Sequence, residues 1–258
     1  MIRSTFKYII ETFEELFELI GYFLPTGFRR KLRWLKEHVF SKLWFRGSLG
    51  LLLVFFGIFM LLGSTIESNL VSKMSKDSYN QHIVTGKSHN KGMYDFSKVK
   101  AASPKNAVQA RLSLPSDVVG KLSVPELGVK VSIYLGVSNA NLNRGAGTMK
   151  PNQQMGQGNY TLAGHHMDND DSLLFGPLAR AKTGQVALLT DGKYVYTYRI
   201  ISRREVTKYA VNVLNDVRGK CLLTMITCAQ GGKTRWCVTG TLVKTQRLTK
   251  HLQSIYFA

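Results

Sequence analysis

Short apolar runs separated by turn residues dominate the chain from about residue 110 onward. These runs occupy residues 118–124, 129–135, 159–163, 185–190, 194–201, 221–227 and 236–243. Turn signals such as Asp191-Gly192 and Gly231-Gly232 lie between them, and residues 172–181 are expected to form a short helical turn. Seven or eight short strands with few helices predict an all-β domain over residues 109–258, built as an antiparallel barrel or a sandwich.

A long apolar segment of a different kind precedes this domain. Residues 47–66 carry no charge, and Arg46 and Glu67 bracket them. As a helix this run spans roughly 30 Å, which matches the hydrocarbon core of a bilayer. A buried core helix is the alternative, but the charged brackets and the uninterrupted apolar run disfavour it. We therefore predict a transmembrane signal anchor that contacts membrane lipid through residues 47–66. A cleaved signal peptide is disfavoured, because no convincing cleavage site follows the apolar run.

Basic residues on the N-terminal flank set the expected orientation. They are Arg29, Arg30, Lys31, Arg33, Lys36, Lys42 and Arg46. Positive flanks stay inside, so residues 1–46 should be cytoplasmic and the β domain extracytoplasmic, in a single-pass protein of the cell membrane. An amphipathic helix is predicted within this segment over residues 5–23, and the polar residues 67–108 are predicted to be an extracytoplasmic linker.

The net charge of +19 favours anionic partners such as lipid or a cell-wall polymer. Nucleic acid is not predicted as a partner, because the chain has no zinc-finger spacing, no aromatic RNA-binding motif and no basic recognition helix. Three cysteines lie close together in the β domain, namely Cys221, Cys228 and Cys237. An odd count leaves at least one thiol outside any disulfide, and a disulfide framework is not indicated.

The last two apolar runs bring a cysteine and an arginine together. If Gly231-Gly232 forms a two-residue turn, Cys228 lies directly opposite Arg235 on the same face of the hairpin. Directly paired Cβ atoms are about 4.5–5.5 Å apart. A nearby cation favours the nucleophilic thiolate, and a guanidinium can donate to the oxyanion that forms when a thiolate attacks an amide. The same register places Cys237 opposite Ile226, and Cys237 and Cys221 are expected to be small buried residues.

A histidine is the usual group to protonate a leaving amine near neutral pH. Only His165 and His166 fall within the β domain, just after the run 159–163. Strand alternation places His165 on the face of Ala163 and His166 on the opposite face. The acidic stretch that follows the histidines, up to Asp171, lacks the glutamate of an EF-hand loop and any zinc spacing, so a solvated loop without metal or other cofactor is predicted.

At these residues the sequence resembles the class A sortases of Gram-positive bacteria. Thr224-Met225-Ile226-Thr227-Cys228 is similar to the TLxTC signature of that family, and Leu162-Ala163-Gly164-His165 is similar to its histidine motif. Arg235 occupies the position of the family's essential arginine. The segments Leu142-Asn143-Arg144-Gly145 and Gly147-Thr148-Met149 also match, and the similarity covers about residues 114–245.

The resemblance implies an eight-stranded antiparallel β-barrel and a cysteine transpeptidase. Such enzymes cleave the LPxTG sorting signal of surface proteins between Thr and Gly, hold the protein as a thioester, and transfer it to an amine of a peptidoglycan precursor. Carried over, Cys228 is the nucleophile, His165 the general acid and then base, and Arg235 stabilises the oxyanion or holds the substrate backbone. The residues implied to bind the substrate are Ala163, Val211, Val213, Leu214, Ile226 and Thr227, although the apolar ones among them could equally be core residues.

The sequence departs from the family pattern in two ways, and three alternatives to this interpretation remain. Some class A members bind calcium through acidic residues, but the matching positions here are Lys150, Gln153 and Gln157, which leave only Asp216, so no calcium activation is expected. The loop between Cys228 and the arginine is also short. The alternatives are a pilin-polymerising sortase, disfavoured by the lack of a second hydrophobic segment after the domain, a cysteine peptidase, or a non-catalytic, membrane-tethered β-barrel that binds wall polymers.

Overall fold

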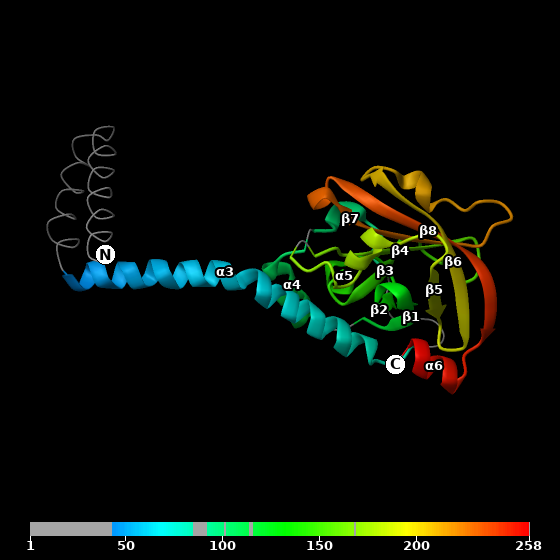
Figure 1. The fold of residues 1–258 in the computed structure, drawn as a ribbon, viewed down its shortest axis with the longest axis horizontal. Coiled ribbons are helices and arrows are strands. Elements are labelled where there is room, and N and C mark those ends of the chain that lie inside the picture. The colour runs from blue at the N-terminus through cyan, green and yellow to red at the C-terminus, as the bar shows by residue number, and fades with distance from the viewer. Residues whose placement is uncertain (1–42, 85–91, 101, 114–115, 168, 258) are drawn as a thin grey trace. The chain divides into compact units, whose positions relative to one another are not determined.

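The computed structural model describes residues 43–84, 92–100, 102–113, 116–167 and 169–257. The amphipathic helix predicted for residues 5–23 lies outside these ranges. The chain divides into two compact units, with the boundary between Leu61 and Leu62. The second unit holds the whole β domain (Figure 1).

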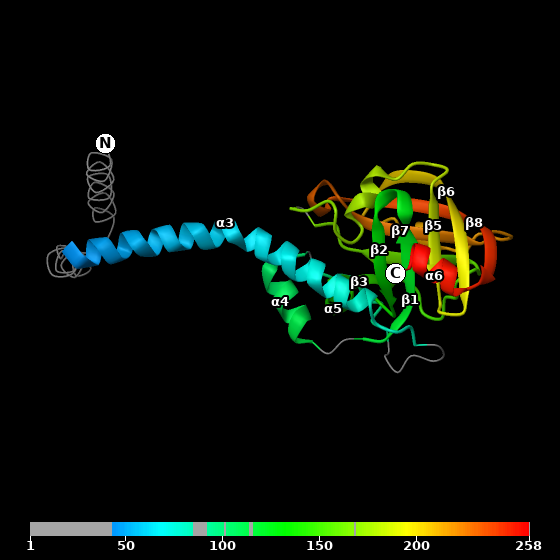
Figure 2. The same cartoon turned by 60° about the horizontal axis from the view of Figure 1, so that its bottom comes forward.

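Eight strands close into a barrel, which excludes the sandwich. They are β1 (Val118–Val124), β2 (Val129–Tyr134), β3 (Gly145–Thr148), β4 (Asn159–Gly164), β5 (Val186–Thr190), β6 (Tyr194–Thr207), β7 (Leu222–Ala229) and β8 (Thr234–Arg247). Around the barrel the order is β1-β2-β3-β4-β7-β8-β6-β5 (Figures 1 and 2). Fully buried aliphatic side chains such as Leu122, Ile133, Leu162, Leu189 and Leu223 fill the interior.

The prediction of a purely antiparallel barrel was wrong at two places. Strand β2 pairs with β3 in parallel, and β4 pairs with β7 in parallel. Parallel neighbours require a crossover connection. The crossover between β4 and β7 contains the β5–β6 pair. Because β4 and β7 run in parallel, their C-terminal ends lie side by side at the same end of the barrel. This second parallel pair positions the site described below.

Strand β3 was missed because it lacks an apolar run. Its sequence, Gly-Ala-Gly-Thr, resembles a loop, yet close approach of the backbone requires the glycines. A Cβ on Gly145 would lie 2.3 Å from the carbonyl oxygen of Ser132, and one on Gly147 would lie 2.3 Å from that of Gly136. The other predicted strands are all present, and the helical turn expected within residues 172–181 is the 3-10 helix η4 (Gly176–Arg180).

The segment 67–108, predicted as a linker, contains helical residues that pack on the barrel. Helix α3 (Leu43–Tyr79) continues through it, and its Val71 and Met74 are buried in the main hydrophobic core. Helix α4 (Pro104–Leu112) buries Ala107 and Ala110 in the same core. Among the described residues of each helix, the buried apolar residues of the core are only two, spaced three positions apart. The rest of each segment is largely polar, so the periodic apolar pattern that predicts a helix is weak there.

Arg144 fastens α4 to the barrel. Its guanidinium is buried and donates to the carbonyl oxygen of Ala110 at 2.6 Å and to that of Ser113 at 2.8 Å. These carbonyls lie at the C-terminal end of the helix, where a cation compensates the unpaired carbonyl groups. Helices α5 (Asn139–Leu142) and α6 (Lys250–Tyr256) complete the second unit.

The apolar run 47–66 lies in α3, and large apolar side chains there, such as Leu51 and Phe55, are exposed. A search of the described residues finds no helix with the length and hydropathy required to cross a bilayer.

Candidate active site

A cavity of about 760 Å³ opens at the C-terminal ends of β4 and β7. Its walls come from the end of β4, the end of β7, the β7–β8 turn, the end of β6 with the segment that follows it, and the 3-10 helix η2 (Phe96–Lys98) with the residues after it. All residues assigned to a site from the sequence line this cavity: Ala163, His165, Val211, Val213, Leu214, Ile226, Thr227, Cys228 and Arg235. Barrel closure therefore brings three separate parts of the chain together at one place.

Cys228 and Arg235 are paired across the β7–β8 hairpin, as the sequence predicted. The turn is longer than the predicted two residues, because β7 ends at Ala229 and β8 begins at Thr234. The register is unchanged, since the extra residues are added symmetrically around Gly231 and Gly232. Both glycines have positive φ angles of 60° and 85°, a conformation that glycine adopts without strain.

The Arg235 guanidinium is held by its own hairpin. Its Nη1 donates to the carbonyl oxygen of Gly232 at 2.9 Å and to that of Thr234 at 2.8 Å. These two bonds restrain the planar group against its own hairpin turn, and the hairpin register pairs Arg235 with Cys228. A fixed donor of this kind is suited to a charge that develops only during reaction.

His165 directly follows β4 and is 5% exposed. Burial lowers the pKa of its imidazole to about 4, because the charged form loses its hydration. The ring is therefore neutral at neutral pH. Its Nε2 atom is buried and has no hydrogen-bond partner among the residues that the structure describes. A neutral imidazole with an unsatisfied ring nitrogen can accept or pass on a proton as the reaction requires.

The aliphatic residues of the cavity form one wall that is partly core, because Ile226 is only 8% exposed. Val211 is 67% exposed and lies with Val213 and Leu214 on the 3-10 helix η5 (Val211–Leu214). Ala163 and Ile226 are direct partners across the β4–β7 pair. Two packed strands and one short helix thus present aliphatic side chains toward the same space.

Thr227 differs from these aliphatic residues, because its side chain is buried and its hydroxyl donates to the carbonyl oxygen of Gly164 at 2.9 Å.

Cys237 pairs with Ile226 as predicted and is fully buried, and burial raises the pKa of its thiol. Cys221 is half-buried, and no disulfide joins any of the cysteines. Of the three sulfurs, only that of Cys228 belongs to a residue of the cavity.

A family model described as a sortase domain matches residues 122–243. The Sortase A of Listeria monocytogenes is 31% identical over 217 residues, which are 81% of this chain and 97% of that protein. The chain belongs to the sortase family. The Sortase A of Streptococcus agalactiae agrees with this assignment, at 33% identity over 241 residues that cover 89% of this chain and 92% of that protein.

The named relatives support class A, and membership makes the chain a cell-wall transpeptidase. A crystal structure of the Listeria monocytogenes sortase A superposes with a TM-score of 0.53 at 39% identity, covering 54% of this chain and 97% of that one. Sortase C-3 of Streptococcus pneumoniae has a TM-score of 0.52 over 76% of this chain and 92% of that one. At 19% identity that second likeness concerns the fold alone.

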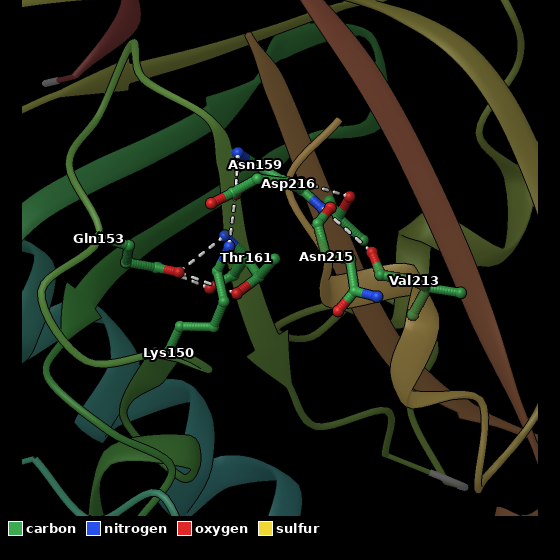
Figure 3. Close-up of polar contacts among 8 residues, drawn as sticks. Lys150, Gln153, Asn159, Thr161, Val213, Asn215 and Asp216 are labelled. Carbon is green, nitrogen blue, oxygen red and sulfur yellow. Dashed lines mark hydrogen bonds and ion pairs between the residues drawn. The ribbon is translucent and has the colours of Figure 1, made fainter. Parts of the chain in front are cut away.

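The positions that match the family's calcium ligands are occupied by an ion pair. The Lys150 ammonium lies 2.7 Å from Asp216 Oδ1, which also accepts from the Asn159 backbone N–H at 2.7 Å (Figure 3). The hydrogen bond from Lys150 holds the pKa of the Asp216 carboxyl below its usual range. Gln153 bonds Thr161 through both ends of its amide. Calcium requires 6–8 oxygen ligands, and these residues do not fit it.

We expect activity of this sortase to be the same in added calcium and in chelator, because the Lys150 ammonium already neutralises Asp216. The measurement is kcat/KM for a fluorogenic sorting-signal peptide under both conditions. The variant Lys150→Glu provides the matched control. It places two carboxylates together, so its activity should fall and any calcium response should appear in it alone. A calcium-stimulated wild-type enzyme would contradict this expectation.

The buried imidazole of His165 should also make stability depend on pH. In the unfolded chain its pKa returns to the ordinary value of 6.5, against about 4 in the folded protein. Between these two values the unfolded state binds the extra proton, so the free energy of unfolding falls as the pH falls from 6.5 toward 4. The loss is on the order of 3 kcal/mol for this group. Urea titrations across this range should give a flatter profile for His165→Gln than for the wild type.

Two parts of the site were missed by sequence reasoning. Residues Phe96, Ser97, Val99 and Lys100 line the cavity, although they belong to the predicted linker. Asn139 holds this segment in place, since its side chain accepts from the Lys100 backbone N–H at 2.8 Å and donates to the Lys98 carbonyl oxygen at 3.2 Å. Nothing in the local sequence indicates that contact. The second omission is His166, whose contacts are described below.

Proposed function

We propose that this sortase cleaves LPxTG-type sorting signals between Thr and Gly through a thioester on Cys228, and transfers the acyl fragment that ends in Thr to an amine of a peptidoglycan precursor. The observation that carries the proposal is one cavity in which Cys228 pairs with Arg235, a buried neutral His165 lies at the end of the neighbouring strand, and an aliphatic wall faces the same space.

The resting protonation of the site determines the order of proton transfers. His165 is neutral at rest, so the proton that it gives to the leaving amine must first come from the Cys228 thiol. As the Sγ atom bonds the Thr carbonyl carbon, the carbonyl oxygen becomes an oxyanion, to which the Arg235 guanidinium donates. His165 then protonates the Gly nitrogen, the C–N bond breaks, and the thioester remains.

The second half of the reaction reverses these roles. An acceptor amine attacks the thioester carbonyl, and His165 removes a proton from the amine as the new amide bond forms. The C–S bond breaks, and the sulfur of Cys228 recovers its proton from His165. Atoms and charge therefore balance over the cycle, with no cofactor required.

The aliphatic wall supports the choice of signal. Leu and Pro side chains are apolar, and burying them against Val211, Leu214 and Ile226 removes apolar surface from water at about 25 cal/mol per Å². Val211 in particular is exposed, so an apolar substrate residue that covers it would remove its side chain from water and strengthen binding. The neutral Leu-Pro end of the signal thus fits this wall better than a charged peptide would.

We further propose that residues 47–66 anchor the enzyme in the cell membrane, with the N-terminus inside and the catalytic domain outside. The uncharged sequence, its helical conformation and the basic N-terminal flank support this topology. The test is fractionation of cells that express the chain, followed by protease treatment of protoplasts. Recovery in the soluble fraction, or protection of the domain from external protease, would refute this topology.

The activity is tested by incubation with an LPxTG-type peptide and a panel of amines, followed by intact-protein and peptide mass spectrometry. An acyl adduct on Cys228 and a new amide with a precursor-type amine are expected. Hydrolysis alone would indicate a cysteine peptidase, and use of a pilin lysine in preference would indicate a polymerising sortase. If no adduct forms with any signal peptide, the domain is a wall-binding module and the proposal fails.

A further inference from the structure

The backbone pairing of β4 and β7 ends just before the residues that the mechanism uses. The last paired residues are Ala163 and Ile226, whereas His165 and Cys228 lie two positions farther along. The backbone ladder therefore ends where the cavity begins. The paired part of β4 and β7 thus stops short of the residues that carry the imidazole and the thiol.

Two bonds from side chains join the strands beyond this point. The Thr227 hydroxyl donates to the carbonyl oxygen of Gly164, and the His166 ring lies with Nδ1 3.0 Å from the carbonyl oxygen of Cys228. The first bond runs from a β7 side chain to the β4 backbone, and the second runs from the segment that follows β4 to the β7 backbone. Together they replace the missing part of the ladder between the histidine segment and the cysteine segment.

The His166 contact defines which nitrogen carries hydrogen. A carbonyl oxygen only accepts, so Nδ1 must be the donor. On the other side of the ring, Nε2 lies 2.5 Å from Asp171 Oδ1, so a hydrogen bond joins this ring nitrogen to the carboxyl group. A carboxyl group that bonds one ring nitrogen in this way holds the orientation of the imidazole, so that Nδ1 stays directed at the Cys228 carbonyl oxygen. Asp171 itself is set by a tight turn, in which Asp170 Oδ1 accepts from the Ser172 backbone N–H at 2.9 Å.

We propose that His166 is a positioning residue, which with Asp171 holds the Cys228 carbonyl and so fixes the nucleophile relative to the histidine beside it. The His166 side chain is 17% exposed and Asp171 is 63% exposed. His166 lies outside the set of residues that line the cavity, so it acts through Cys228 and not on the substrate. The proposal rests on the proposed function only in assigning the nucleophile to Cys228.

The test compares His166→Leu with His166→Asn in the full-length chain. Leucine removes the donor, whereas the asparagine amide nitrogen can occupy the place of Nδ1 and donate to the same carbonyl. We expect His166→Leu to lower kcat roughly tenfold, the loss of one hydrogen bond to a polarised site, with KM nearly unchanged. His166→Asn should recover most of that loss. His251→Leu, which removes an exposed histidine on α6, is the matched control.

A second readout does not depend on the sorting-signal reaction. Alkylation of Cys228 by iodoacetamide, measured by mass spectrometry against the half-buried Cys221 in the same molecule, should slow several-fold in His166→Leu and return in His166→Asn. If peptide turnover fails but this alkylation pattern holds, the proposed function is wrong and the positioning role stands.

The positioning role is overturned if His166→Leu matches His251→Leu in both kcat and alkylation, or if only KM rises. It is also overturned if His166→Asn restores nothing while remaining folded by thermal unfolding. Should the leucine variant fail to fold, Asp171→Ala decides. Loss of the carboxylate frees the ring to turn, and unchanged kcat and alkylation in that variant would reject the proposal.

Discussion

Replacement of Cys228 by alanine is expected to abolish both the acyl adduct and peptide transfer. The other two sulfurs cannot substitute, because Cys237 is fully buried with a raised pKa and Cys221 lies outside the residues of the cavity. Removal of a covalent nucleophile typically costs about 10³-fold or more in kcat/KM. The measurement is steady-state cleavage of a fluorogenic signal peptide together with intact-protein mass spectrometry.

The matched controls are Cys221→Ala and Cys237→Ala. Neither should alter kcat/KM appreciably, although the second removes a buried sulfur and should lower the midpoint of thermal unfolding. Surface anchoring of sorting-signal proteins in cells that carry only the Cys228→Ala chain would show that the enzyme hypothesis is incorrect. Continued formation of an adduct on another residue would reassign the nucleophile.

The second large effect is expected for Arg235→Lys. Lysine keeps the positive charge but loses the planar group, whose Nη1 is held by the carbonyl oxygens of Gly232 and Thr234. Without that fixed geometry the oxyanion loses an aligned donor, and kcat should fall about 10²–10³-fold. The drop should be seen in the acylation step, measured by rapid-quench trapping of the thioester.

Arg247→Lys, an exposed substitution at the far end of the same strand, is the control and should leave acylation unaltered. Because Arg235 also bonds the hairpin turn, thermal unfolding must show that the Arg235→Lys domain remains folded. A rise in KM with an unchanged rate of acylation would show that Arg235 holds the substrate backbone and does not stabilise the oxyanion.

Much of the barrel could be predicted from local patterns. Seven strands appear as short apolar runs, and the hairpin register followed from the position of two glycines, because cross-strand pairing is symmetric about a turn. The pattern failed at β3, where backbone contact replaced side-chain packing, and at the helical residues around Val71 and Ala107, where a narrow apolar stripe lies in a polar sequence.

The site was predictable to different degrees for its different members. Cys228 and Arg235 are seven positions apart, so a single hairpin determines their pairing. His165 could be selected as one of two histidines in the β domain and by its motif, but its place beside Cys228 depends on the parallel pairing of β4 with β7. His166 was assigned only to the opposite face, and no local signal indicates its bond to the Cys228 carbonyl.

By itself, the sequence determined the features that arise between neighbouring residues: the strands with apolar runs, the hairpin that pairs a thiol with a guanidinium, and the family motifs. Tertiary structure alone decided the features that depend on distant segments: the closed barrel, the crossover that brings His165 to the cysteine strand, the ion pair of Lys150 with Asp216, and the low pKa of the buried imidazole. The physical reason is that alternation and turn geometry act over a few residues, whereas burial and electrostatic environment are summed over every segment that packs around a group.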